Sequence, residues 1–271
     1  MNTFIENGRI TLADKRIDSD IIDDKFENHL FLRLVAKEQR FTKVSFKYSI
    51  FDNSYLRKCE FDSCDFTGCK FIGTNFTGST FTGCKFDYAI FERTNITSDI
   101  LNTECPPYEN VKKSFAQSLR VNYQQIGDSK SVNKAVNVEL QATINHLYKE
   151  WNSNESYYRK KYTGLNRIRS FLKWLEFHIL DFIWGNGESI VKMFRGVFFV
   201  LLFIACYDMY ISNTELSLGN FLSSLCNSFP IFLGVFTPEY YSNLHLSIIV
   251  LVRVIAVSFL ISIIIKRFNR R

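Results

Sequence analysis

Residues 44–96 read VSFKYSIFDNSYLRKCEFDSCDFTGCKFIGTNFTGSTFTGCKFDYAIFERTNI. Every fifth position of this stretch carries a bulky apolar side chain, and the residue two positions earlier is mostly small. An α-helix would repeat every 3.6 residues and a simple strand every two, so a period of five fits neither. The spacing predicts a chain that turns a corner every five residues, with one large and one small side chain pointing inward on each side.

The large inward positions run without a break through eleven repeats. They are Phe46, Phe51, Leu56, Phe61, Phe66, Phe71, Phe76, Phe81, Phe86, Phe91 and Ile96. This pattern resembles that of the pentapeptide-repeat proteins, whose chains wind into a right-handed quadrilateral β-helix with four repeats in each coil. The resemblance implies that side chains twenty residues apart stack in ladders, and that each coil buries its ladder against the next. It places residues 42–104 in this β-helix.

The sequence defines residues 1–40 less clearly than that segment. Ile21, Leu30, Leu32 and Val35 have a helix-like spacing within residues 17–40. We therefore expect residues 1–41 to form an N-terminal cap region that covers the first coil.

The cysteines and charges of the repeat segment argue against metal and nucleic-acid binding. Cys59, Cys64, Cys69 and Cys84 each occupy a small inward slot without C-x-x-C spacing, so core packing explains them. Residues 41–100 contain seven acidic and seven basic residues, which provides neither the acidic surface of a DNA mimic nor a basic stripe. The sequence also lacks the H-E-x-x-H, G-x-S-x-G and glycine-rich phosphate motifs of enzymes. We expect no catalytic residues, no metal, no cofactor and no nucleic-acid partner.

Two helical regions follow the repeats. Residues 106–164 have the periodicity of a helical hairpin. Residues 165–187 are rich in large apolar side chains, which three basic residues interrupt: Arg167, Arg169 and Lys173. This composition predicts an amphipathic helix in the membrane interface, and a helix packed on the soluble domain is the alternative.

The last quarter of the chain holds two long apolar runs, residues 196–211 and 246–265. Each is long enough to cross a ~30 Å hydrocarbon core, the first with an added turn at its ends. Basic residues flank both runs on one side, and residues 212–245 between them contain neither Lys nor Arg. The flanking residues are Lys192, Arg195, Lys266 and Arg267. This asymmetry predicts a multi-pass protein of the inner (plasma) membrane, residues 188–271, with both termini in the cytoplasm.

Each predicted span carries one charge. Asp208 lies thirteen residues after Arg195, and Arg253 lies thirteen residues before Lys266. If Arg195 and Lys266 mark one boundary, the two charges lie at matched depth, about 20 Å from it. Because intramembrane charges are costly unless paired, we expect Asp208 and Arg253 to pair within one chain or between neighbouring chains. Such a pair would either line a pore or only register the two helices.

The connection between the spans contains a broken apolar segment, Phe221 to Phe236, interrupted by Pro230 and Gly234. It is too short for a third span, and we expect a re-entrant helix or, alternatively, a cap on the outer leaflet. The plan of span, re-entrant segment and span resembles the channel-like domain at the end of some membrane-bound pentapeptide-repeat proteins. Phe236 stands where a potassium-channel filter has its second glycine, so the sequence does not support potassium selectivity.

Together these features predict a multidomain membrane protein with a β-helix, a helical hairpin and two spans. The leading functional hypothesis is an ion-channel-like or membrane-perturbing effector regulated through its cytosolic repeat domain. Two spans cannot enclose a pore alone, so this hypothesis requires self-association in the lipid bilayer. The alternative is a membrane-anchored scaffold whose β-helix binds a cytosolic protein partner.

Overall fold

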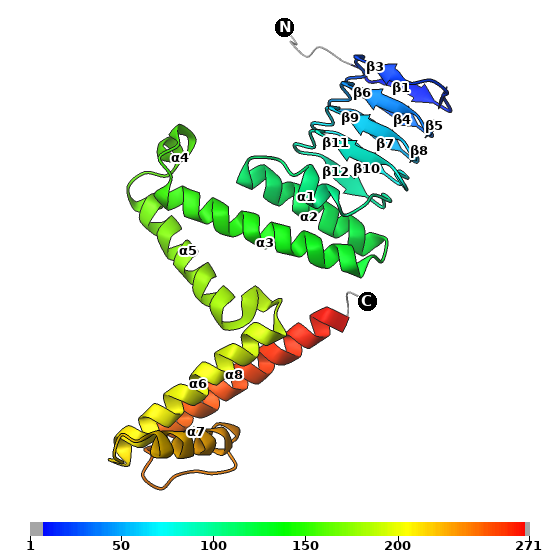
Figure 1. Ribbon diagram of the computed structural model, residues 1–271. Helices are drawn as coiled ribbons and strands as arrows, with labels where there is room; N and C mark the ends of the chain where they lie inside the picture. The colour runs from blue at the N-terminus through cyan, green and yellow to red at the C-terminus, as the bar shows by residue number, and fades with distance from the viewer. Residues whose placement is uncertain (1–7, 269–271) are drawn as a thin grey trace. The chain divides into compact units, whose positions relative to one another are not determined.

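The computed structural model describes residues 8–268, without the side chains of residues 267 and 268. The chain divides into two compact units, with the boundary between Ser170 and Phe171. The first unit contains all the β-strands, which form a stack of parallel coils in blue to cyan in Figure 1. The strands in the described part of the chain are β1 (Ile10–Ala13), β2 (Arg16–Ile17), β3 (Ile21–Ile22), β4 (His29–Leu32), β5 (Val35–Lys37), β6 (Arg40–Thr42), β7 (Ile50–Asp52), β8 (Tyr55–Arg57), β9 (Glu60–Asp62), β10 (Lys70–Ile72), β11 (Thr80–Thr82) and β12 (Ile90–Glu92).

The strands pair in parallel with a register of twenty residues. One sheet has the order β1-β4-β7-β10-β12, a second β11-β9-β6-β3 and a third β2-β5-β8. Isolated bridges from Lys25 through Ser45 and Asp65 to Lys85 make the fourth side. Since a full coil takes twenty residues and has four sides, each side uses five residues. The predicted β-helix is therefore correct, and it makes just over four coils between Ile10 and Ile96.

Stacked phenylalanines fill the interior of this solenoid. Phe46 and Phe66 have ring centroids 5.2 Å apart, and Phe66 and Phe86 have centroids 5.1 Å apart, in nearly parallel planes. Phe51, Phe71 and Phe91 form a second ladder with spacings of 5.2 and 5.1 Å. Rings from adjacent sides meet edge to face, an arrangement that adds to the energy of apolar burial. Each coil thus depends on contacts with the coils above and below it.

Left-handed backbone at each corner allows the chain to turn every five residues. The corners at Gly68, Gly73, Gly78 and Gly83 have φ between +57° and +77°. In the other coils the same position holds residues with side chains, such as Tyr48 and Lys58, at φ of +59° and +54°. A left-handed conformation costs a residue with a Cβ atom roughly 1–2 kcal/mol, so the repeating hydrogen bonds must offset this strain.

The expectation of a separate cap region at residues 1–41 is wrong for the part that the structure describes. Six of the strands, β1 to β6, lie between Ile10 and Thr42 and belong to the solenoid. Phe26, Phe31, Ala36 and Phe41 continue the inward positions at a spacing of five, and the last three are buried. The helical periodicity of residues 17–40 is therefore coincidental. Residues 1–7 lie outside the described part.

A helical hairpin covers the C-terminal end of the solenoid. It follows the short α1 (Ile100–Thr103) and consists of α2 (Glu109–Gln125) and α3 (Ser129–Asn152), with α4 (Ser156–Lys161) after it. Figure 1 shows α2 against the last coil at β12. Three side chains of α2 bond the backbone of that coil. Ser118 Oγ accepts from Phe91 N at 2.8 Å, Asn122 Oδ1 from Thr94 N at 2.7 Å and Gln125 Oε1 from Arg93 N at 2.9 Å. The hairpin thereby closes a strand edge that would otherwise be open.

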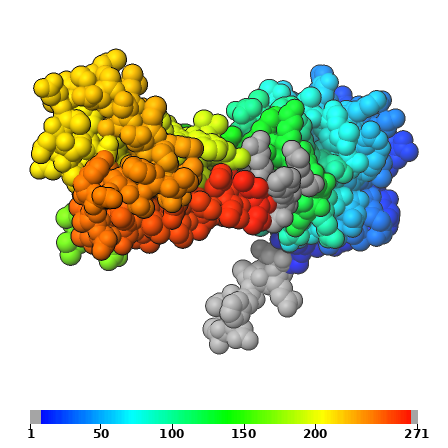
Figure 2. Space-filling view, turned by 90° about the horizontal axis from the view of Figure 1, so that it is seen from below, coloured from blue at the N-terminus to red at the C-terminus, as the bar shows by residue number. Residues whose placement is uncertain are grey.

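The second unit is entirely helical in the described residues. The helix α5 (Leu165–Trp184) begins in the first unit and ends in the second, and a 3₁₀ turn at Gly185–Gly187 follows it. The unit continues with α6 (Ile190–Ile211), α7 (Leu218–Leu233) and α8 (Asn243–Phe268). Figure 2 shows α6, α7 and α8, in yellow, orange and red, in contact with one another.

Candidate functional site in the α6–α7–α8 unit

Two helices of this unit are long and apolar enough to cross a membrane. The helix α6 has 22 residues and a mean hydropathy of 2.0 in its most apolar window, and residues 243–266 of α8 have a mean hydropathy of 3.0. Only 17% and 6% of these windows are buried inside the protein. A core helix of a soluble protein would bury most of its apolar side chains, and these two helices expose them.

The two charges inside these apolar helices have separate partners. Asp208, which is 4% exposed, accepts hydrogen bonds from the hydroxyl groups of Tyr240 at 2.7 Å and Tyr241 at 3.3 Å. Both tyrosines lie in the connection that follows α7. Arg253 Nη1 instead donates to the carbonyl oxygen of Leu233, the last residue of α7, at 2.6 Å.

The expected pair of Asp208 and Arg253 does not form within the chain. The prediction assumed that Arg195 and Lys266 lie at one level, whereas Lys266 forms an ion pair with Glu188. From that level Arg253 is thirteen residues away, about 20 Å, and Asp208 is twenty residues away, about 30 Å. The ring of Tyr207, next to Asp208, contacts that of His245 with a centroid distance of 4.3 Å, and His245 lies eight residues before Arg253. The two charges are thus offset by about 10 Å along the helices, which is too far for a direct bond.

Arg253 holds the C-terminal end of α7. Gly234 follows α7 with φ of +76°, and a Cβ atom there would collide with the guanidinium group of Arg253. The backbone N–H groups of Gly234 and Val235 bond the carbonyls of Ile231 and Pro230, as in a Schellman end. A cation near the last carbonyls of a helix is favourable because the negative end of the helix dipole points there. Gly234, the guanidinium group of Arg253 and the C-terminal end of α7 therefore pack directly against one another.

The position of α7 along α8 follows from this contact. Arg253 lies ten residues after Asn243, so its backbone is about 15 Å from the N-terminal end of α8. An arginine side chain on a helix leans toward the helix N-terminus, so the end of α7 lies somewhat closer to that end of α8 than this. Phe221 lies in the first turns of α7, Pro230 lies within it and Phe236 lies just beyond it, half exposed. The segment is thus helical up to the glycine, with an irregular return to α8.

Ion pairs join the other end of the unit. Lys192 Nζ lies 2.6 Å from Asp181 of α5, and Arg195 donates to the backbone carbonyl of Phe182. The α5 and α6 helices approach closely here, since a Cβ atom on Gly196 would lie 2.7 Å from Ile183 O. Of the four basic residues chosen as topology anchors, the side chain of Arg267 lies outside the described part.

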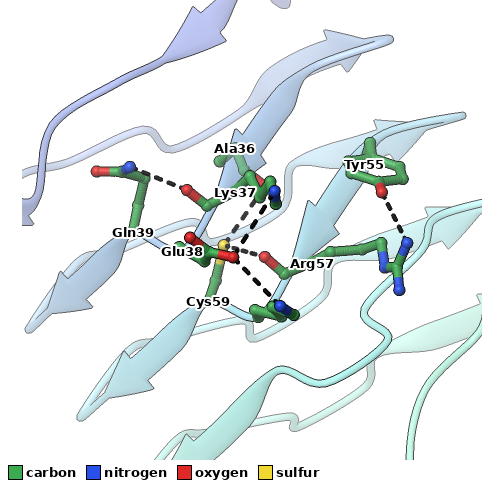
Figure 3. A network of polar contacts seen from close by, with 8 residues as sticks. Ala36, Lys37, Glu38, Gln39, Tyr55, Arg57 and Cys59 are labelled. Atoms are coloured by element: carbon green, nitrogen blue, oxygen red, sulfur yellow. Dashed lines mark hydrogen bonds and ion pairs between the residues drawn. The ribbon is translucent and has the colours of Figure 1, made fainter.

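Cys59 and Cys69 of the solenoid act as packing groups. Figure 3 shows the Cys59 thiol beside the backbone carbonyls of Ala36 and Arg57, each 3.5 Å from its sulfur. Burial raises the pKa of the Cys59 thiol, and it raises that of Cys69 to about 12. Protonated thiols are poor metal ligands and nucleophiles. Within the described residues no group of three or more His, Cys, Asp or Glu side chains converges as a metal site.

Sequence reasoning missed the partners of Asp208 and Arg253. Tyr240 and Tyr241 carry no charge and lie in an irregular connection, so no periodicity marks them. Glu188 had a usable signal, because it is the only acidic residue between Asp181 and Asp208 and it stands beside the first basic flank. Its pairing with Lys266 would have corrected the depth of Arg253.

Comparisons with known proteins bear on the solenoid. The family profile described as pentapeptide repeats, in eight copies, matches residues 40–78 and 59–97. No curated protein matches the chain.

Solved structures that match include Rfr23, a pentapeptide repeat protein of the cyanobacterium Cyanothece 51142. Its sequence is 12% identical to this chain, and the TM-score is 0.22. The match covers 28% of this chain and 58% of Rfr23, so this chain spans less than two thirds of the length of Rfr23. QnrB1, a plasmid-mediated fluoroquinolone resistance protein in trypsin-treated form, is 15% identical with a TM-score of 0.21, over 33% of this chain and 79% of that one. A pentapeptide repeat protein of the Arabidopsis thaliana thylakoid lumen is 14% identical with a TM-score of 0.19, over 37% and 76%.

The matched repeats coincide with the coils of the solenoid from β6 to β12. Their period of five is the period at which the backbone turns its corners, and it holds the stacked phenylalanines in register. The N-terminal solenoid of this chain is therefore a pentapeptide-repeat β-helix, and residues 40–97 belong to the pentapeptide-repeat family.

Proposed function

We propose that the chain is an integral membrane protein that crosses the bilayer through α6 and α8 and keeps its pentapeptide-repeat domain in the cytoplasm. The observation that carries this proposal is the exposure of α6 and α8, which leave most of their apolar side chains uncovered. Lipid is the medium in which such helices are stable. The cationic ends of the spans, at Lys192, Arg195 and Lys266, mark the cytoplasmic side.

We further propose that several copies assemble into an ion-conducting pore, with α7 as a re-entrant helix. The contact between Arg253 and Leu233 supports this arrangement, because it holds the end of α7 well inside the length of α8. Irregular backbone at membrane depth is tolerated where it is buried or lines a water-filled cavity. Residues 234–242 would be that backbone. The permanently charged Arg253 needs polar surroundings at the same level, which a water-filled pore provides.

Conductance of the purified full-length protein in planar bilayers tests this function. The proposal predicts single-channel currents that change in amplitude or open time in an Arg253→Gln variant with unchanged assembly. Lys85→Gln, an exposed change on the solenoid, is the matched control and should conduct as the parent does. Protein that is inserted and oligomeric but electrically silent would contradict the pore.

A membrane-anchored scaffold is the second candidate, and one observation favours it. The exposed face of α8 carries large apolar side chains, such as Leu251, Val254 and Ile261. The charged residues in the sequence of α8 are Arg253, Lys266 and Arg267, and the last two lie at its C-terminal end. A tether needs no polar lining. In this case the solenoid would remain functional in partner binding when α6 and α8 are exchanged for unrelated spans, and conductance would be absent in all forms.

A further inference from the structure

The α5 helix exposes an apolar face along its whole length. Eight of its large apolar side chains recur at intervals of three and four residues, which places them on one side of the helix. These eight are exposed: Leu165, Ile168, Phe171, Leu172, Leu175, Ile179, Phe182 and Ile183. An apolar stripe of this length on a soluble surface is unusual and calls for a covering medium.

The opposite side of α5 is already held by protein. Ser170 Oγ donates to Glu150 Oε2 of α3 at 2.8 Å, and Arg167 Nε donates to the carbonyl of Trp151 at 2.6 Å. Further along, Asp181 pairs with Lys192 of α6. These bonds fix the polar side of α5 to its neighbours within each unit. The last turn of the stripe packs beside α6, where the rings of Phe182 and Phe199 have centroids 5.3 Å apart, and the rest of the stripe faces outward.

Two cations on α5 stand apart from the others near the membrane boundary. Lys192 and Lys266 form ion pairs, and Arg195 bonds a carbonyl. Arg169 and Lys173 have no hydrogen bond or ion pair within the described residues. They lie four residues apart, one turn of the helix, and therefore on the same side of it. On a helical wheel both fall at one edge of the apolar stripe, where long cationic side chains reach the level of lipid phosphates.

We propose that α5 lies in the headgroup layer of the cytoplasmic leaflet, and that Arg169 and Lys173 bind the phosphate groups of acidic phospholipids there. This inference rests on the proposed insertion of α6 and α8. The continuity of α5 with α6 across the turn at residues 185–187 supports it, because that turn places the end of α5 at the cytoplasmic boundary. The edge that carries Arg169, Lys173 and Glu176 has a net positive charge. This charge favours acidic lipid over a second copy of the chain, whose α5 would present the same net positive charge.

Fluorescence from a probe on the apolar stripe tests the location. In full-length protein with Cys206→Ser and Cys226→Ser, an environment-sensitive dye on Leu175→Cys reports α5, and the same dye on Ile255→Cys reports α8. The proteins are placed in nanodiscs of phosphatidylcholine with or without phosphatidylglycerol. With the acidic lipid we expect blue-shifted emission at residue 175 and strong quenching by lipids brominated near the headgroup.

The charge variants test the ligand. Each cation near an anionic surface contributes about fivefold to binding, so Arg169→Gln with Lys173→Gln should raise the fraction of acidic lipid needed for the half-maximal shift severalfold. Lys43→Gln with Lys85→Gln removes the same charge from exposed positions of the solenoid and should leave the shift unchanged.

The outcomes separate this inference from the proposed function. A lipid-embedded dye at residue 255 with a water-exposed dye at residue 175 would overturn the inference alone. Water exposure at both positions would overturn both proposals. Emission at residue 175 that follows protein concentration and ignores lipid charge would identify a second copy as the occupant, which also contradicts the proposal.

Discussion

The solenoid and the α6–α7–α8 unit place their apolar side chains in opposite positions. In the solenoid the phenylalanines point inward and stack, and the charged residues point outward at the corners. In the helical unit most large apolar side chains are exposed, whereas Asp208 is buried under two tyrosines and Arg253 lies against a helix end. One unit thus buries its apolar side chains and the other leaves most of them uncovered. We therefore expect the stability of the first unit to depend on its buried apolar side chains. The stability of the second unit should depend on polar contacts and on the hydrogen bonds at helix ends.

The largest expected effect is the loss of a central ring from the solenoid. Phe66 is fully buried and contacts the rings of Phe46 and Phe86 in the adjacent coils. Phe66→Ala should destabilise the protein by about 3–5 kcal/mol because it removes a large buried group and leaves a cavity. Val254→Ala, on the exposed face of α8, should change stability in detergent by less than ~1 kcal/mol. Chemical unfolding followed by circular dichroism measures both, and equal losses would contradict the comparison.

The second-largest loss of stability should follow from breaking the hydrogen bonds between α2 and the last coil. Asn122 is fully buried, and its amide bonds both the N–H and the C=O of Thr94. Asn122→Ala leaves these two backbone groups without partners, at a cost of about 2–4 kcal/mol. Asn110→Ala, at an exposed position of the same helix, is the control and should be nearly neutral. Hydrogen exchange should show faster opening of β12 in the Asn122→Ala variant. Unchanged protection of β12 would show that these hydrogen bonds do not hold the last coil.

A smaller loss of stability is expected when the contact between Arg253 and the C-terminal end of α7 is disturbed. Gly234→Ala introduces a Cβ atom into a left-handed position that the guanidinium group of Arg253 already fills, so we expect a loss of roughly 1–3 kcal/mol. Gly219→Ala lies in the same helix, with its nearest neighbouring atom 3.9 Å away, and should be tolerated. In a double-mutant cycle, Arg253→Ala should remove part of the cost of Gly234→Ala. Additive losses in thermal unfolding would show that the two residues do not interact.

The smallest expected effect is a pH dependence at the base of the helical hairpin. Burial lowers the pKa of His146, and the nearby Lys161 and Lys113 act in the same direction, while Glu150 and Glu109 oppose them. The unfolded chain therefore binds the proton more readily, and stability present above about pH 6.5 is lost as the pH falls below it. Thermal midpoints between pH 8 and pH 5.5 measure this loss. His146→Gln should flatten the curve, and an unchanged slope in that variant would assign the effect to other groups.

The sequence predicts the solenoid well where its repeat is unbroken. Between Phe46 and Ile96 every inward position is large, and the structure stacks these residues at a register of twenty. Before Phe46 the pattern weakens, because Ala36 fills an inward position with a small side chain and Leu34 fills a slot that is small elsewhere. The earlier coils nevertheless pair with the later ones through the same hydrogen-bond register of twenty residues. Nearest-neighbour stacking can therefore extend a solenoid beyond the repeats that are visible in its sequence.

The sequence predicts the two long apolar helices but not how they align along their axes. Hydropathy identifies α6 and α8, since each consists almost entirely of apolar residues. The position of one charge relative to the other depends on which flanking residues lie side by side, and that is decided by the pairing of Glu188 with Lys266, which are 78 residues apart. The hydroxyl groups that bind Asp208 are also supplied by tertiary contact. Such contacts leave no periodic trace along the chain.

The topology of the chain in intact cells is the most direct test of the membrane account. In a background with Cys206→Ser and Cys226→Ser, Leu216→Cys places a thiol in the highly exposed connection between α6 and α7, and Lys85→Cys places one on the solenoid. A membrane-impermeant maleimide added to whole cells should label residue 216 at once and residue 85 only after lysis. Labelling of both positions only after lysis, or recovery of the chain in the supernatant without detergent, would contradict the two-span arrangement.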